Sequence, residues 1–211
     1  MDKLALSDER IALALSPYGI ELSLDQSSKV QEYIRILLKW NRLIGLTTIR
    51  EPVEIVARHF GESMFFASIV PVENCRLADV GSGAGFPGLA LKILSPSLQV
   101  ILIESNKKKS AFLAEVARCL NLKGVEIITA RYEEVRNDFG SVNIVTARAV
   151  GGFSSLLRWT KRMLAPRGHI ALWVGGEDAA TVSKIQGWIW QPAVRIPESQ
   201  RRFILVGRPL P

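Results

Sequence analysis

The chain has 211 residues, of which 48% are hydrophobic, and 27 Lys and Arg against 20 Asp and Glu give it a formal net charge of +7. This composition is typical of a globular protein and excludes a disordered chain, a collagen and a disulfide-stapled secreted scaffold. The length exceeds that of a typical single domain by tens of residues. It therefore predicts one compact core with an appendage rather than two full domains.

The two cysteines, Cys75 and Cys119, are too few for a structural zinc site, so we expect no metal and interpret both as reduced, buried thiols. No basic segment followed by an apolar one opens the chain, and no apolar run reaches about 18 residues. We therefore expect a cytoplasmic protein that does not contact a membrane. Residues 151–211 carry a charge of +6. Such a region suits a polyanion such as nucleic acid, and a solvated surface explains it equally well.

Residues 1 to about 70 are predicted to be helical. Between residues 24 and 46, apolar residues recur at the spacing of one helical face, with Lys29 and Arg35 among the basic residues between them. One or two further helices are expected over residues 54–68, before Pro71 ends this region.

After residue 76, short β-rich runs alternate with amphipathic stretches. The expected strands are residues 77–80, 100–103, 125–128, 142–146 and 170–174, and the expected helices are residues 88–94, 107–120, 131–136 and 153–164. This alternation predicts a parallel sheet covered by helices on both faces. Residues 194–196 and 203–206 are joined by a link too short for a crossover helix, so we expect them to form an antiparallel pair.

A glycine-rich loop links the first expected strand to the helix after it. Gly83, Gly85 and Gly88 match the G-x-G-x-x-G pattern of dinucleotide-binding proteins, and Glu104 lies at the position expected for a carboxylate that binds a ribose hydroxyl. This match by itself has low specificity. Ligands of such sheets bind at the carboxyl ends of the strands, which is where the loop lies.

A second pattern in the same loop places Asp79 on the strand and glycines at every second position from Gly81. It resembles motif I of S-adenosylmethionine-dependent methyltransferases. A carboxylate at the strand end would repel a pyrophosphate and attract the ammonium group of a methionine moiety, so Asp79 favours this methyl donor. Glu104 would accept hydrogen bonds from the ribose under either pattern.

Several separated segments together resemble one family. They are residues 38–41 with 46–47, Arg58 with His59, Glu62 with Ser63, residues 79–88, residues 104–105 with 107–108 and 112–113, residues 131–134, and residues 147–149. In these segments the chain resembles the RsmG family, also called GidB, of bacterial methyltransferases that act on guanine N7 in small-subunit ribosomal RNA. The Gly-Phe-Pro-Gly end of the loop is this family's own variant.

The resemblance implies a Rossmann-like class I methyltransferase fold, with a helical extension over residues 1–70 and the core over residues 71–211. It also implies S-adenosylmethionine as cofactor and the small-subunit ribosomal RNA or the ribosomal subunit as partner. By the same resemblance, Gly81 and Phe86 line the cofactor site, Tyr132 and Glu133 border the adenine, and Arg148 contacts cofactor or substrate.

Four residues depart from the family pattern. Gly45 replaces an Asn, Glu62 and Glu104 replace Asp, and Val174 replaces a Lys that would contact substrate. The change from Asp to Glu keeps the charge and moves it by one methylene, whereas Val174 removes a polar contact.

Transfer of a methyl group to guanine N7 needs no base, because N7 carries a lone pair and no proton, and positioning can carry the reaction. Arg148 ends the fourth expected strand, and its planar donors suit guanine O6, so we assign it the catalytic role. His59 and the run of Lys107, Lys108 and Lys109 are equally well explained as structural or solvated residues.

We therefore expect a monomeric enzyme that methylates guanine N7 in 16S ribosomal RNA. Two alternatives stay open at this point: an RNA-binding ribosome assembly factor without catalytic activity, and a methyltransferase that acts on another RNA.

Overall fold

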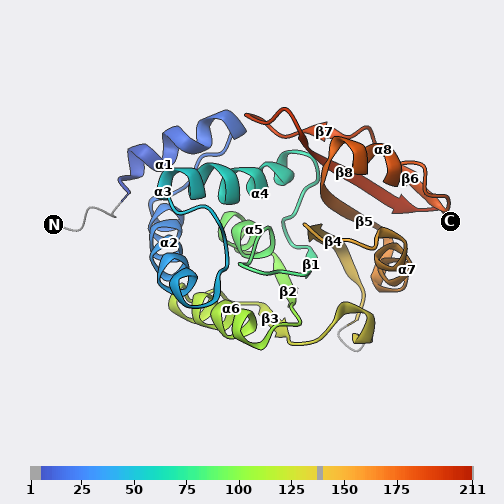
Figure 1. Ribbon diagram of the computed structural model, residues 1–211, viewed down its shortest axis with the longest axis horizontal. Coiled ribbons are helices and arrows are strands. Elements are labelled where there is room, and N and C mark those ends of the chain that lie inside the picture. Colours follow the sequence, from blue (N-terminus) through green and yellow to red (C-terminus); the bar gives the residue numbers. More distant parts are fainter. Residues whose placement is uncertain (1–5, 137–139, 211) are drawn as a thin grey trace.

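The structure, a computed structural model, describes residues 6–136 and 140–210 (Figure 1). Within these ranges no helix combines the length and the apolar character needed to cross a membrane.

The first third of the chain is helical, as predicted. Its elements are α1 (Asp8–Leu15), η1 (Ser16–Tyr18), α2 (Leu24–Ile44), α3 (Pro52–Ile55), η2 (Val56–Gly61), α4 (Glu62–Met64) and η3 (Phe65–Ser68). A capping box between Ser23 and Gln26 starts α2, and Gly45 ends it in the left-handed conformation, with φ of +61°. Capping residues thus fix both ends of this amphipathic helix.

Eight strands form one sheet in the order β3-β2-β1-β4-β5-β8-β6, with β7 paired to β8. They are β1 (Arg76–Val80), β2 (Gln99–Ile103), β3 (Val125–Ile128), β4 (Val142–Arg148), β5 (Leu164–Gly175), β6 (Trp188–Trp190), β7 (Val194–Arg195) and β8 (Arg202–Pro209). Strands β1 to β5 run parallel, and β8 runs antiparallel to β5, β6 and β7. The predicted parallel sheet and the antiparallel pair at its end are both confirmed.

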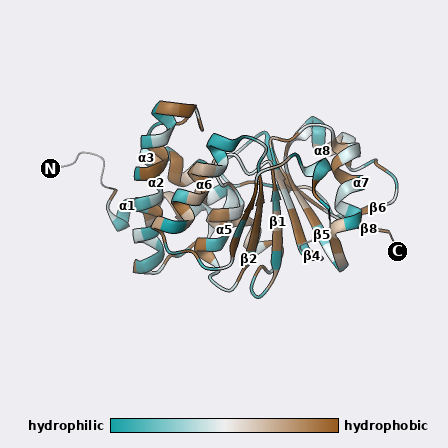
Figure 2. Ribbon diagram, turned by 90° about the horizontal axis from the view of Figure 1, so that it is seen from below, coloured by the Kyte–Doolittle hydropathy of each residue, from teal (hydrophilic) through white to brown (hydrophobic). Residues whose placement is uncertain are grey.

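Helices cover both faces of the sheet (Figure 2). On one face lie α5 (Gly88–Leu94) and α6 (Lys107–Cys119), against which α2 and α4 pack, and on the other lie α7 (Phe153–Met163) and α8 (Gly176–Val182). The central strands are buried on both faces, which explains their almost continuous apolar runs. The N-terminal helices therefore share one apolar core with α5 and α6.

Five details differ from the predictions. The expected helix over residues 131–136 is a single turn, η4 (Tyr132–Glu134), because most of this segment is exposed and has no apolar face to bury. Helix α8 and strand β6 were not predicted, since seven and three residues are too short for a periodic signal. Cys119 is exposed, because it lies on the solvent side of the last turn of α6, and Cys75 is half-buried.

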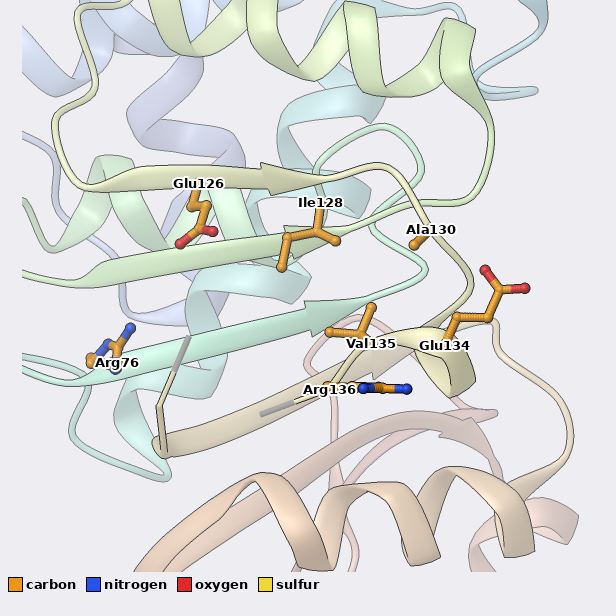
Figure 3. Close-up of a pocket in the computed structure, with 7 residues that line it drawn as sticks. All are labelled: Arg76, Glu126, Ile128, Ala130, Glu134, Val135 and Arg136. Atoms are coloured by element: carbon orange, nitrogen blue, oxygen red, sulfur yellow. The ribbon is translucent and has the colours of Figure 1, made fainter. Parts of the chain in front are cut away.

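The short η4 leaves part of the sheet uncovered. A cavity of about 530 Å³ lies there, beside β3 and the segment that follows it (Figure 3). Its lining includes Glu126, Glu134, Arg76 and Arg136, so its charges are mixed.

Tyr33 of α2 holds the glycine-rich loop in place, because its hydroxyl donates a hydrogen bond of 2.6 Å to the Ala84 carbonyl. We predict that Tyr33→Phe lowers the free energy of unfolding by about 1 kcal/mol, since the Ala84 carbonyl then loses its partner. Urea denaturation measures this change. Tyr18→Phe is the matched control, because Tyr18 is also buried and its hydroxyl has no hydrogen-bond partner in the described ranges. An equal loss in both variants would contradict the prediction.

Candidate active site at the carboxyl edge of the sheet

The loop after β1 is shaped by glycines. Gly81, Gly83 and Gly85 all have positive φ, at +67°, +54° and +82°. A side chain at Gly85 would meet the Tyr33 hydroxyl at 2.2 Å, and one at Gly81 would meet Val150 at 2.9 Å. Both the backbone conformation and the available space therefore require glycine at these two positions.

Asp79 lies beneath this loop and is completely buried. Its two carboxylate oxygens accept hydrogen bonds from the Thr146 hydroxyl at 2.7 Å and from the Gly88 amide at 3.1 Å. Burial raises the pKa of Asp79 to about 7, against the lowering effect of these hydrogen bonds. Through these two hydrogen bonds Asp79 joins β1 to β4 and to the start of α5.

Glu104 directly follows β2 and also binds the loop. One carboxylate oxygen accepts from the Gly83 amide at 2.9 Å and the other from the Asn106 amide at 2.8 Å. A carboxylate has about four acceptor sites, so each oxygen keeps one for a further donor.

Phe86 faces the N-terminal helices. Its ring stacks on His59 at 4.8 Å and on Tyr33 at 5.3 Å, and it is only 6% exposed. The Phe86 side chain is thus packed among aromatic rings of the N-terminal helices. Burial, together with the guanidiniums of Arg148 and Arg58, lowers the pKa of His59 to about 3, so this ring is neutral.

Tyr132 and Glu133 lie in η4, past the end of β3 and at the same edge of the sheet as the loop. The Tyr132 hydroxyl pairs with Ser155 at 2.9 Å, and its ring packs edge-on against Trp159. Glu133 is exposed. The structure thus brings Gly81, Gly83, Glu104 and these two residues to one edge of the sheet.

Arg148 ends β4 and belongs to a charged cluster around Glu62 that the sequence interpretation did not identify as a site. The carboxylate of Glu62 is 1% exposed and contacts Arg58 at 3.0 Å, Arg148 at 3.3 Å and Arg202 at 2.9 Å. These four residues come from α4, η2, β4 and β8. The spacing of Arg58 and Glu62, at i and i+4, is a local signal, whereas Arg148 and Arg202 become neighbours only through the fold.

A cavity of about 290 Å³ lies beside this cluster and the loop. Arg148, Val150 and Val174 line it, and Val150 is the residue that a side chain at Gly81 would strike. Val174, where the family pattern has a Lys, therefore lies in the lining.

Other residues considered from the sequence lie as follows. Lys107 and Lys108 are exposed at the start of α6, which Asn106 caps. Of the tryptophans, Trp159, Trp173 and Trp188 are buried in the core, whereas Trp40 and Trp190 are only partly buried.

These features define a class of protein. A glycine loop after β1, an acidic residue at the end of β2 and the strand order of the sheet are those of a Rossmann-like class I methyltransferase. A similar fold occurs in the crystal structure of a SAM-dependent methyltransferase from Aquifex aeolicus, with a TM-score of 0.62 and 15% identity over 75% of this chain and 94% of that one. The predicted fold is confirmed.

The family follows from more similar sequences. Residues 26–186 match the family described as GidB, rRNA small subunit methyltransferase G. Proteins named ribosomal RNA small subunit methyltransferase G from Dichelobacter nodosus and Roseiflexus castenholzii are 36% and 41% identical to this chain. The matches cover 75% and 76% of this chain and 74% and 73% of those proteins. The chain belongs to this family of S-adenosylmethionine-dependent methyltransferases, and the resemblance stated from its motifs is confirmed.

Glu62 compensates three guanidiniums, and removing its charge leaves them without a buried partner. We predict that Glu62→Gln lowers the free energy of unfolding by about 3 kcal/mol. Glu62→Asp keeps the charge and should lower this free energy by less than half as much. The measurement is urea denaturation. Glu32→Gln is the control, because Glu32 pairs with Arg35 at the surface and should lose less than about 1 kcal/mol. Equal losses in Glu62→Gln and Glu32→Gln would refute the assigned role.

Proposed function

We propose that this protein transfers a methyl group from S-adenosylmethionine to N7 of a guanosine in 16S ribosomal RNA. Membership of the rRNA small subunit methyltransferase G family is the observation that carries this proposal. We further propose that it acts in the cytoplasm as a monomer, with residues 1–70 as a helical extension and residues 71–211 as the methyltransferase core. Its macromolecular partner would be the small-subunit RNA or the subunit itself.

The residues at the carboxyl edge fit S-adenosylmethionine. A side chain built on Gly83 would have only the Gly81 carbonyl within 4 Å, so the loop is open to a ligand at this point. Glu104 keeps acceptor sites for the ribose hydroxyls, and Tyr132 and Glu133 lie where they would border the adenine. When bound, this cofactor supplies an electrophilic methyl group on a sulfonium.

The other loop residues would set the conformation of the loop that binds the cofactor. Gly81 and Gly85 allow the left-handed turns, Asp79 holds the loop to β4 and α5, and Phe86 holds it to the N-terminal helices. We infer that Asp79 and Phe86 contribute to cofactor binding through this positioning. The ligand itself would contact the backbone of the loop.

The proposed reaction needs no general base, because guanine N7 has a free lone pair. Among the residues that the structure describes, none is a hydrogen-bond partner of the buried Arg148 Nη1, and Arg148 lines the cavity beside the loop. Donation from Nη1 to guanine O6 would hold the base with N7 beside the methyl donor and favour in-line transfer. The proposed contribution of this chain is therefore orientation of the base.

Calorimetric titration with S-adenosylmethionine tests the cofactor site. We expect the wild-type protein to bind and Gly81→Asp to lose binding at least about 100-fold, because the new side chain would strike Val150 and distort the loop. Gly19→Asp is the control: Gly19 has nearly the same φ, +66°, but nothing lies within 4 Å of its missing side chain. Unchanged binding by Gly81→Asp, or no binding by the wild type, would contradict the proposal.

Mapping N7-methylguanosine in ribosomal RNA tests the substrate. Cells that lack the gene should lose one such modification in 16S RNA, and the purified protein should restore it. Loss of a modification in another RNA would redirect the proposal to that RNA. An unchanged map would favour an assembly factor without catalytic activity.

A further inference from the structure

The cavity beside the glycine loop has the size and position of a substrate site. It has a volume of about 290 Å³ and lies between the ends of β4 and β5 and the starts of α7, α8 and β8. Val150 lies between it and the backbone of Gly81, so a group bound in the cavity would lie next to a ligand of the loop.

Three polar groups in the lining are free to bind a ligand. Arg148 uses Nη2 for the Arg58 carbonyl and the Glu62 carboxylate, at 3.1 and 3.3 Å, whereas its buried Nη1 has no partner. Asp178, in the first turn of α8, has neither a hydrogen bond nor an ion pair with any residue of the described ranges. Arg202, also in the lining, has a buried Nε without a hydrogen-bond partner among the described residues. The lining therefore has free donors on Arg148 and Arg202 and one free carboxylate.

The other walls are mostly apolar. Phe153, Trp173 and Ile196 contribute side chains to the lining, and the indole N–H of Trp173 is already bonded to the Glu62 carbonyl at 3.0 Å. Walls of this kind accommodate the faces of a flat ring, and they leave recognition of its edge to Arg148 and Asp178.

We infer that Asp178 is a specificity residue that reads the Watson–Crick edge of guanine in this cavity. This inference rests on the proposed function. The Asp178 carboxylate accepts from guanine N1–H and from the exocyclic N2 amino group, while Arg148 Nη1 donates to O6. Because none of these contacts uses N7, which lies on the neighbouring Hoogsteen edge, N7 stays free to accept the methyl group.

The charges of the lining favour a base over a phosphate. Among the lining residues, the guanidiniums of Arg148 and Arg202 are matched in number by the carboxylates of Glu62 and Asp178, so the lining itself carries no net charge. Adenine fits less well than guanine, because its N1 is an acceptor that would face the Asp178 carboxylate. A carboxylate left without a donor is costly, and this cost is the basis of the discrimination.

The experiment compares guanosine with inosine, which lacks only the exocyclic amino group, at the methylated position of the RNA. Transfer of a labelled methyl group from S-adenosylmethionine gives kcat/KM for each RNA. With the wild type, inosine should lower kcat/KM roughly 10-fold. We call the ratio of kcat/KM for the guanosine RNA to kcat/KM for the inosine RNA the inosine penalty. Asp178→Ala should lower kcat/KM for the guanosine RNA by roughly 10- to 100-fold. It should also reduce the inosine penalty to about twofold or less.

The matched control is Glu177→Ala, because Glu177 is also exposed in the first turn of α8 but does not line the cavity. It should keep the wild-type inosine penalty. Calorimetry should give Asp178→Ala the wild-type affinity for S-adenosylmethionine, which shows that the variant is folded.

An inosine penalty in Asp178→Ala equal to that of the wild type would overturn the inference and leave the proposed function intact. Equal effects of Asp178→Ala and Glu177→Ala would also overturn it. Absence of methyl transfer by the wild type to the guanosine RNA would instead count against the proposed function.

Discussion

The carboxylate of Asp79 is the contact on which the geometry of the site depends. It lies at the centre of the sheet, where it joins β1 to Thr146 of β4 and to the first amide of α5. The chain can therefore leave β1, pass through three left-handed glycines and enter the helix with its polar groups satisfied. Substitution of Gly88 by a larger residue would place its Cβ 2.9 Å from this carboxylate, so glycine and aspartate depend on each other.

The N-terminal helices complete the loop from the other side. Tyr33 donates to the loop backbone, and Phe86 packs between Tyr33 and His59. Glu62 extends this connection to the carboxyl edge of the sheet, because its carboxylate binds Arg148 of β4 and Arg202 of β8. The helical segment is thus part of the construction of the site, since the loop and Arg148 both take their positions from it.

Several features could be predicted because their signals are local. The alternation of apolar runs and amphipathic segments predicted the parallel sheet, and the spacing of Asp79, Gly81 and Gly83 predicted the loop and the class of enzyme. Residues 131–136 were wrongly predicted as a helix, because their charged residues suit a helix surface but supply no buried face. Cys119 was wrongly placed in the core, since the tendency of cysteine to be buried does not decide the orientation of one helix position.

The sequence by itself determined the fold class, the family and the place of the loop at the end of the first strand, because each depends on residue type and short-range spacing. Only the tertiary structure decided what the side chains contact. Asp79 binds the protein itself, Phe86 packs on the helices, and Glu62 gathers Arg148 and Arg202 from distant strands. The physical reason is that burial and charge pairing depend on residues far apart in the chain, which become neighbours only when the sheet and the N-terminal helices have packed together.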